Sequence, residues 1–135
     1  MNSTVAIITD TDSSLPEALA RRYGILQVPI TVQIGEEILE VGVDITDARL
    51  FTRIDKENKL PTTAAPSPGK FAEVYRNAFN NGAETILCFC VSSAVSATYN
   101  NALLAADEEF PGRDITPGLS AHSGPGMLGA TFVTN

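Results

Sequence analysis

Two uncharged, largely apolar runs constrain the fold of this 135-residue chain more than any other feature. The first is VAIIT at 5–9, and the second is TILCFCV at 85–91. Runs of this kind are typical of strands buried in a parallel sheet. Each run is followed by a stretch rich in hydroxyl side chains. Two polar loops are therefore expected at the carboxyl edge of one sheet, where open α/β sheets bind ligands.

The segment after the first strand carries the pattern of a helix start. Ser14 stands three residues before Glu17, with Pro16 between them. This spacing predicts a capping box and a helix over 15–23, which Gly24 ends.

The next segment has the composition of strands. Residues 25–34 are rich in strand-forming residues, with Pro29 as an interruption. A hairpin is expected over 35–41, with its tip at the glycine and the two glutamates. Thr46 or the residue after it then caps a helix over 47–55.

The second half of the chain alternates again between loop, helix and strand. Residues 60–69, LPTTAAPSPG, form a predicted loop, and Ser67 with the proline after it begins a helix that ends at Asn81. The second buried strand follows, and then a helix over 95–110. This order predicts an α/β fold with a Rossmann-like, mainly parallel sheet flanked by helices, as a single domain over 1–135.

The composition excludes several classes of partner. The chain has 16 acidic and 9 basic residues, with a net charge of −7, so nucleic acid is not an expected partner. No apolar run reaches the roughly 20 residues of a membrane span. No basic segment precedes the first apolar run, so we expect no secretory signal and a cytoplasmic protein.

The two cysteines, Cys88 and Cys90, lie on one face of the second predicted strand. This spacing is unsuited to a disulfide. Both are interpreted as small core residues, because a metal or redox site would need two further ligands. No metal site is predicted.

The stretch IITDTDSSL at 7–15 raises an enzymatic alternative. An apolar strand that ends in Asp-x-Asp is typical of haloacid-dehalogenase-like phosphatases, where Asp10 would be the nucleophile and Asp12 the general acid and base. That chemistry also needs a later lysine and an acidic pair for magnesium. The last lysine of the chain is Lys70, and the acidic run at 107–109 lies in a predicted helix end. The phosphatase is therefore the alternative and not the main hypothesis.

Several segments together resemble a known bacterial family, the DegV family. Their order along the chain agrees with that of the family motifs TDSTADLP, DGVDI, PTTSQPSPG, ISSxLSGTY and HTGPG. In this chain they read TDTDSSLP at 9–16, GVDI at 42–45, PTTAAPSPG at 61–69, VSSAVSATY at 91–99 and HSGPG at 122–126.

The resemblance implies a fatty-acid-binding protein that is not an enzyme and needs no cofactor beyond the bound acid. It also implies a long-chain fatty acid as ligand and a dihydroxyacetone-kinase-like fatty acid kinase as partner. A carboxylate removed from water needs several donors, and hydroxyls supply them without a charge. The head-group contacts that the resemblance implies are Thr63, Ser93 and His122, and we add the neighbouring hydroxyls of Thr62 and Ser92. We expect Asp10 to order the loop after its strand by accepting backbone N–H bonds. The other supporting residues are Ser67, Ser96, Gly124 and Gly126.

The match also departs from the family pattern. Residues 1–110 resemble the family's first domain and 118–135 its C-terminal signature, so most of the second domain is missing. The family's strand after the LSGTY helix has no clear counterpart, with 113–116 as a remnant at best. Asp12 replaces a hydroxyl residue and adds negative charge near the expected carboxylate. Three outcomes stay open: a homodimer that encloses the lipid, a module that binds a protein or a smaller acid, and a remnant that binds nothing.

Overall fold

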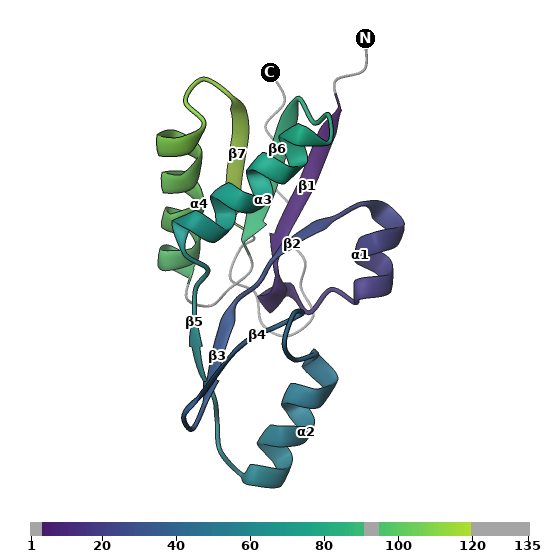
Figure 1. The fold of residues 1–135 in the computed structure, drawn as a ribbon, viewed down its shortest axis with the longest axis vertical. Coiled ribbons are helices and arrows are strands. Elements are labelled where there is room, and N and C mark those ends of the chain that lie inside the picture. Colours follow the sequence, from purple (N-terminus) through teal and green to yellow (C-terminus); the bar gives the residue numbers. More distant parts are fainter. Residues whose placement is uncertain (1–3, 91–94, 120–135) are drawn as a thin grey trace.

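The computed structural model describes residues 4–90 and 95–119, which form two sheets (Figure 1). The larger sheet is parallel, with the order β2-β1-β6-β7. The smaller sheet is antiparallel, with the order β4-β3-β5. The predicted α/β fold with a parallel sheet is confirmed. The strands are β1 (Val5–Asp10), β2 (Leu26–Val28), β3 (Thr31–Ile34), β4 (Glu37–Glu40), β5 (Thr62–Ala64), β6 (Thr85–Cys90) and β7 (Asp114–Leu119).

The helices begin and end largely where the capping residues predict. The Lys70 N–H donates to Ser67 Oγ at the start of α3, and the Arg49 N–H donates to Thr46 Oγ1 at the start of α2. Gly24 ends α1 in the left-handed conformation, with φ of 65°. The helices are α1 (Glu17–Tyr23), α2 (Asp47–Glu57), α3 (Pro68–Asn80) and α4 (Val95–Glu109), with a 3-10 helix η1 (Thr11–Ser13) after β1.

The main core lies between the parallel sheet and the helices α3 and α4, which pack on the same face. Phe71 and Tyr75 of α3 are fully buried there, against Ile8 and Ile86 of the central strands. Cys88 and Cys90 are buried free thiols in the same core. The interpretation of both cysteines as core residues is confirmed.

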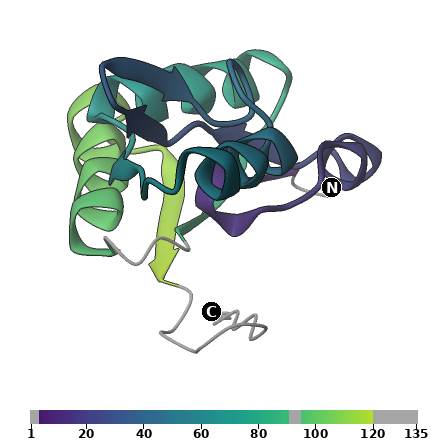
Figure 2. The same ribbon diagram turned by 90° about the horizontal axis from the view of Figure 1, so that it is seen from below.

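The other face of the parallel sheet is less well covered. Val5 and Ile7 of β1 remain 47% and 39% exposed, and Leu87 and Phe89 of β6 are half-buried. α1 lies beside β2, away from α3 and α4 (Figure 2). The expected burial of these two strands is thus met on one face of the sheet and not on the other, because the two longest helices cover one face only.

The predicted capping box at Ser14 is also wrong. Ser14 adopts a left-handed conformation, with φ of 51°, at the end of η1. α1 begins only at Glu17, and its first turn has no side-chain cap. The polar residues after β1 form the 3-10 turn instead, and the Leu15 N–H donates to Ser13 Oγ.

β7 corrects a second expectation. The sequence left no clear strand after α4, yet residues 114–119 pair with the whole of β6 in parallel register. Thr85 Oγ1 donates to Asp114 Oδ2 over 3.0 Å at the start of this pairing. Pro117 masks the strand in the sequence, but proline is tolerated on an edge strand, where its missing N–H has no partner to lose.

β5 is a further strand that was predicted as loop. Thr62 pairs with Gln33, and Ala64 pairs with Thr31. β5 has three residues in the stretch between Pro61 and Pro66, which are too few to show a strand period.

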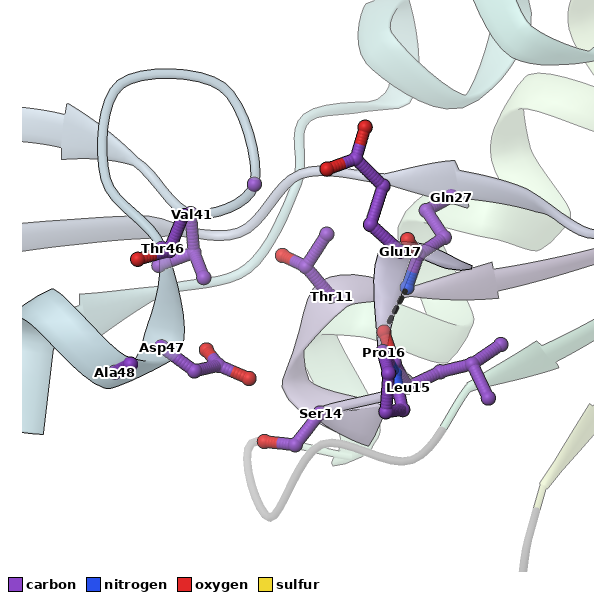
Figure 3. Close-up of a pocket in the computed structure, with 11 residues that line it drawn as sticks. Thr11, Ser14, Leu15, Pro16, Glu17, Gln27, Val41, Thr46, Asp47 and Ala48 are labelled. Carbon is purple, nitrogen blue, oxygen red and sulfur yellow. Dashed lines mark hydrogen bonds between the residues drawn. The ribbon is translucent and has the colours of Figure 1, made fainter. Parts of the chain in front are cut away.

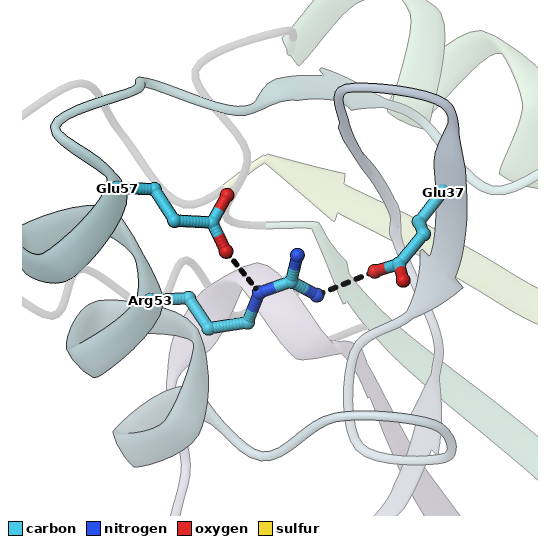
Figure 4. Close-up of polar contacts among 3 residues, drawn as sticks. All are labelled: Glu37, Arg53 and Glu57. Carbon is cyan, nitrogen blue, oxygen red and sulfur yellow. Dashed lines mark hydrogen bonds and ion pairs between the residues drawn. The ribbon is translucent and has the colours of Figure 1, made fainter.

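The small sheet packs against α2 in a core of its own. Val32 and Ile34 of β3 and Leu50 of α2 belong to this cluster of buried residues. Arg53 of α2 also donates to Glu37 of β4 over 2.6 Å and to Glu57 over 2.9 Å (Figure 4). These hydrogen bonds with the two glutamates raise the pKa of Arg53.

One buried hydrogen bond joins the two sheets. The Ile30 N–H, between β2 and β3, donates to Thr11 Oγ1 over 2.9 Å. The turn after β4 approaches the same threonine, since a Cβ on Gly42 would lie 3.3 Å from Thr11 Cγ2. Gly42 also has a φ of 87°, which favours glycine. The first turn after β1 thus holds the small sheet in place.

Candidate functional site

The carboxyl edge of the parallel sheet is the first candidate site, because β1 and β6 end there side by side. Asp10, the last residue of β1, is fully buried. Its Oδ1 accepts the Asp12 N–H over 3.0 Å, which caps η1. The expectation that Asp10 orders this loop by accepting a backbone N–H agrees with this geometry.

The same geometry bears on the phosphatase alternative. A nucleophilic carboxylate must reach the phosphorus atom of a substrate, but Asp10 is enclosed and holds the backbone of η1. Asp12 is exposed. Within residues 4–90 and 95–119, no group of three His, Cys, Asp or Glu side chains could hold a metal ion. The burial of Asp10 disfavours its use as a nucleophile.

The main core contains two ionisable groups, the Cys90 thiol and the Tyr75 hydroxyl, which stay neutral. The Cys88 side chain beside it, together with burial and the charge of Asp10, raises the pKa of the Cys90 thiol. Burial raises the pKa of Tyr75, and Cys88 adds to the effect. The Tyr75 hydroxyl donates to the carbonyl of Ala102 in α4 over 3.2 Å. Both groups are therefore protonated at neutral pH.

Thr62 and Thr63 lie on β5, and both side chains are exposed. β2 leads through Pro29 and Ile30 directly into β3, and β5 pairs with β3. β5 therefore also lies close to the carboxyl edge, as Figure 1 shows. Thr63 pairs with Val32 and Thr62 with Gln33. Neighbouring residues of a strand point to opposite faces, so the two hydroxyls do not face the same space.

The loop after β5 is fixed to both long helices. The Asn101 side chain of α4 donates from Nδ2 to the Pro66 carbonyl over 2.9 Å. Ser67 caps α3 and thus supports the loop through the helix start. The position of the two threonines therefore depends on α4 as well as on the small sheet.

The remaining predicted residues lie outside the description. Ser92, Ser93, His122, Gly124 and Gly126 are not among the described residues, and the side chain of Ser96 is not described. Their roles stay predictions.

A hollow of about 480 Å³ lies beside this edge, between η1, the start of α1 and the start of α2 (Figure 3). Asp47 and Ser14 face each other across it, and Gln27 Nε2 donates to the Leu15 carbonyl on its wall. Sequence reasoning missed this hollow because its residues were interpreted only as parts of helices, caps, turns and strands. It is lined by Thr11, Ser14, Leu15, Pro16, Glu17, Gln27, Val41, Gly42, Thr46, Asp47 and Ala48.

The charges of this hollow are unsuited to a carboxylate ligand. Asp47 and Glu17 both line it, and like charges repel. The exposed hydroxyls of β5 carry no charge. Of the two places, the carboxyl edge is thus better suited to an anionic group. Among the described residues, no helix is both long and apolar enough to cross a membrane.

Known proteins resemble this chain over most of its length. Residues 4–117 match the family model described as "Uncharacterised protein, DegV family". A DegV domain-containing protein of Streptomyces coelicolor is 37% identical over 122 residues, which cover 90% of this chain and 43% of that protein. A DegV domain-containing protein of Halalkalibacterium halodurans is 35% identical over 75% of this chain.

Two solved structures share the fold and are more than a quarter identical to this chain over the matched residues. A DegV family protein from Thermus thermophilus, described for its fatty acid binding, is 36% identical with a TM-score of 0.72. The match covers 87% of this chain and 41% of that one. A stearic acid-binding protein from Eubacterium ventriosum is 28% identical with a TM-score of 0.73, over 84% of this chain and 40% of that one. This chain spans less than half the length of these relatives, and it belongs to the DegV family.

Proposed function

We propose that this chain binds a long-chain fatty acid and that the carboxyl edge of its parallel sheet forms one wall of the site. The observation that carries the proposal is the likeness to the proteins from Thermus thermophilus and Eubacterium ventriosum, which bind fatty acids. Both are similar to this chain in sequence and in fold over more than four fifths of its length.

The proposed head-group contacts are hydroxyl side chains. Thr63 is exposed on β5, and its loop is fixed by the bond between Asn101 and Pro66. Uncharged donors stabilise a carboxylate that leaves water without the cost of burying a second charge. We propose that the hydroxyls of Ser92 and Ser93 and the imidazole of His122 complete this set, and that Thr62, which points to the opposite face of β5, does not share it.

The acyl chain needs an apolar enclosure. Each buried methylene contributes about 0.8 kcal/mol, so a chain of ~16 carbons represents roughly 10 kcal/mol before the ordering costs. A single wall supplies about half of this. We propose that a second copy of the chain supplies the other wall. The exposed Val5 and Ile7 on the open sheet face favour such self-association.

The proposed role is that of a carrier and not of an enzyme. The enclosed Asp10 supports this view against the phosphatase. The partner expected from the family resemblance, a dihydroxyacetone-kinase-like fatty acid kinase, would then act on the bound carboxylate.

Replacement of single hydroxyls tests the head-group set. We expect Thr63→Ala to lower the amount of fatty acid that copurifies with the protein, while Thr52→Ala on the exposed face of α2 leaves it unchanged. Thr62→Ala reports on the opposite face of β5. Lipid extraction and mass analysis measure the result, and equal lipid content in Thr63→Ala and wild type would remove Thr63 from the site.

A further inference from the structure

The hydroxyl of Thr98 in α4 is the one buried side-chain group without a hydrogen-bond partner among the described residues. Thr98 is 0% exposed. Other threonines of the described chain use their hydroxyls: Thr11 accepts from the Ile30 N–H, and Thr52 donates to the Ala48 carbonyl over 2.8 Å. Most buried polar groups in proteins are paired, so an exception calls for a physical reason.

Core packing alone does not explain this threonine. Valine has nearly the same shape and would fill the same space without an unpaired hydroxyl. A side chain that destabilises the free protein, at a site where an apolar substitute of equal size exists, is typical of a residue kept for function.

The position of Thr98 relates it to the candidate site. Ala102, one turn later on the same helix face, accepts from the Tyr75 hydroxyl. Asn101, three residues later, donates to the Pro66 carbonyl in the loop after β5. Thr98 therefore lies in the first turn of α4, on the side of the carboxyl edge and one turn from the contact that fixes the threonines of β5.

We infer that Thr98 is a positioning residue for the carboxylate end of the ligand, and that the Thr98 hydroxyl gains its hydrogen-bond partner only when the ligand is bound at the carboxyl edge. The inference rests on the proposed fatty-acid site. The free protein then carries an unpaired hydroxyl, and binding removes that cost. Binding and the pairing of this hydroxyl are one coupled event, so removal of the hydroxyl stabilises the free form and weakens binding.

The test compares Thr98→Val with Thr98→Ser and with Thr52→Val as a matched control. Each protein is delipidated, its melting temperature is measured, and its affinity for palmitate is measured by calorimetry. Thr98→Val is expected to raise the melting temperature of the free protein and to weaken palmitate binding about tenfold, the size of one hydrogen bond. Thr98→Ser keeps the hydroxyl and is expected to bind within a few-fold of wild type. Thr52→Val is expected to leave the affinity unchanged.

Unchanged palmitate affinity in Thr98→Val would overturn the inference, as would a lower melting temperature of its free form, because the hydroxyl would then already have a partner. In both cases the wild type still binds palmitate. A wild type that binds no palmitate would instead overturn the proposed function, and the inference with it.

Discussion

The two sheets differ in how they are covered and in what they carry. The parallel sheet packs against two long helices, and its core includes the fully buried Phe71 and Tyr75. The antiparallel sheet packs against α2, in a cluster of six buried residues. The antiparallel sheet and α2 form a second, smaller unit, and the exposed hydroxyls of Thr62 and Thr63 lie on it. The comparison suggests that the parallel sheet supplies most of the stability and the small sheet supplies an adaptable part of the site.

The largest expected effect comes from the core of the parallel sheet. Phe71→Ala removes a fully buried ring that lies 6.0 Å from the ring of Tyr75, between centroids. Such a substitution costs about 3–5 kcal/mol. We expect loss of cooperative folding or a large shift of the urea midpoint, measured by circular dichroism. A shift as small as that of a surface variant would contradict the assignment of the main core.

A smaller and local effect is expected in the other unit. Leu50→Ala removes the buried contact of α2 with the small sheet, at a cost of about 2–3 kcal/mol. Hydrogen exchange should accelerate in β3, β4 and α2, while the amides of β1 and β6 stay protected. Uniform acceleration over both sheets would show that the two units unfold together.

The link between the units is tested by Thr11→Val. The substitution leaves the Ile30 N–H without its buried acceptor and should destabilise the protein by about 1–2 kcal/mol. Thr11→Ser keeps the oxygen and serves as the control. If the bond couples the sheets, Thr11→Val should also speed hydrogen exchange in β3, and equal exchange in the two variants would argue against that coupling.

The smallest expected effect is a pH dependence of stability, and it arises in the core of the parallel sheet. The pKa of Cys90 is raised in the folded protein, so its contribution is complete below the pKa of the unfolded thiol, about 8.5, and is lost as the pH rises above it. One unit above that value the expected loss is on the order of 1 kcal/mol. Tyr75 adds a further loss above about pH 10. Urea unfolding between pH 7 and 10 measures the slope, and Cys90→Ala should flatten its first part.

The sequence predicted those elements whose signals are local. The uncharged runs at β1 and β6 and the caps at Thr46 and Ser67 depend on neighbouring residues only. The strand β7 was missed because its register comes from pairing with β6, against the local preference of Pro117. Ser14 was misassigned because one polar pattern can cap a helix or end a 3-10 turn.

The candidate site likewise has features that could be predicted from the sequence and features that could not. The role of Asp10 in the loop follows from its place directly before that loop, and it was predicted. The hollow beside α2 joins segments that lie far apart in the chain, from Thr11 to Ala48, and no local pattern indicates it. The unpaired hydroxyl of Thr98 is likewise a property of packing and could not be seen in the sequence.

Native mass spectrometry of the freshly purified protein, followed by extraction and mass analysis of any lipid, tests the central claim most directly. The account predicts one fatty acid bound in a fixed ratio, with the dimer as the species that holds it. A protein that stays empty, also after incubation with palmitate and oleate, would contradict the claim that this chain forms a fatty-acid site.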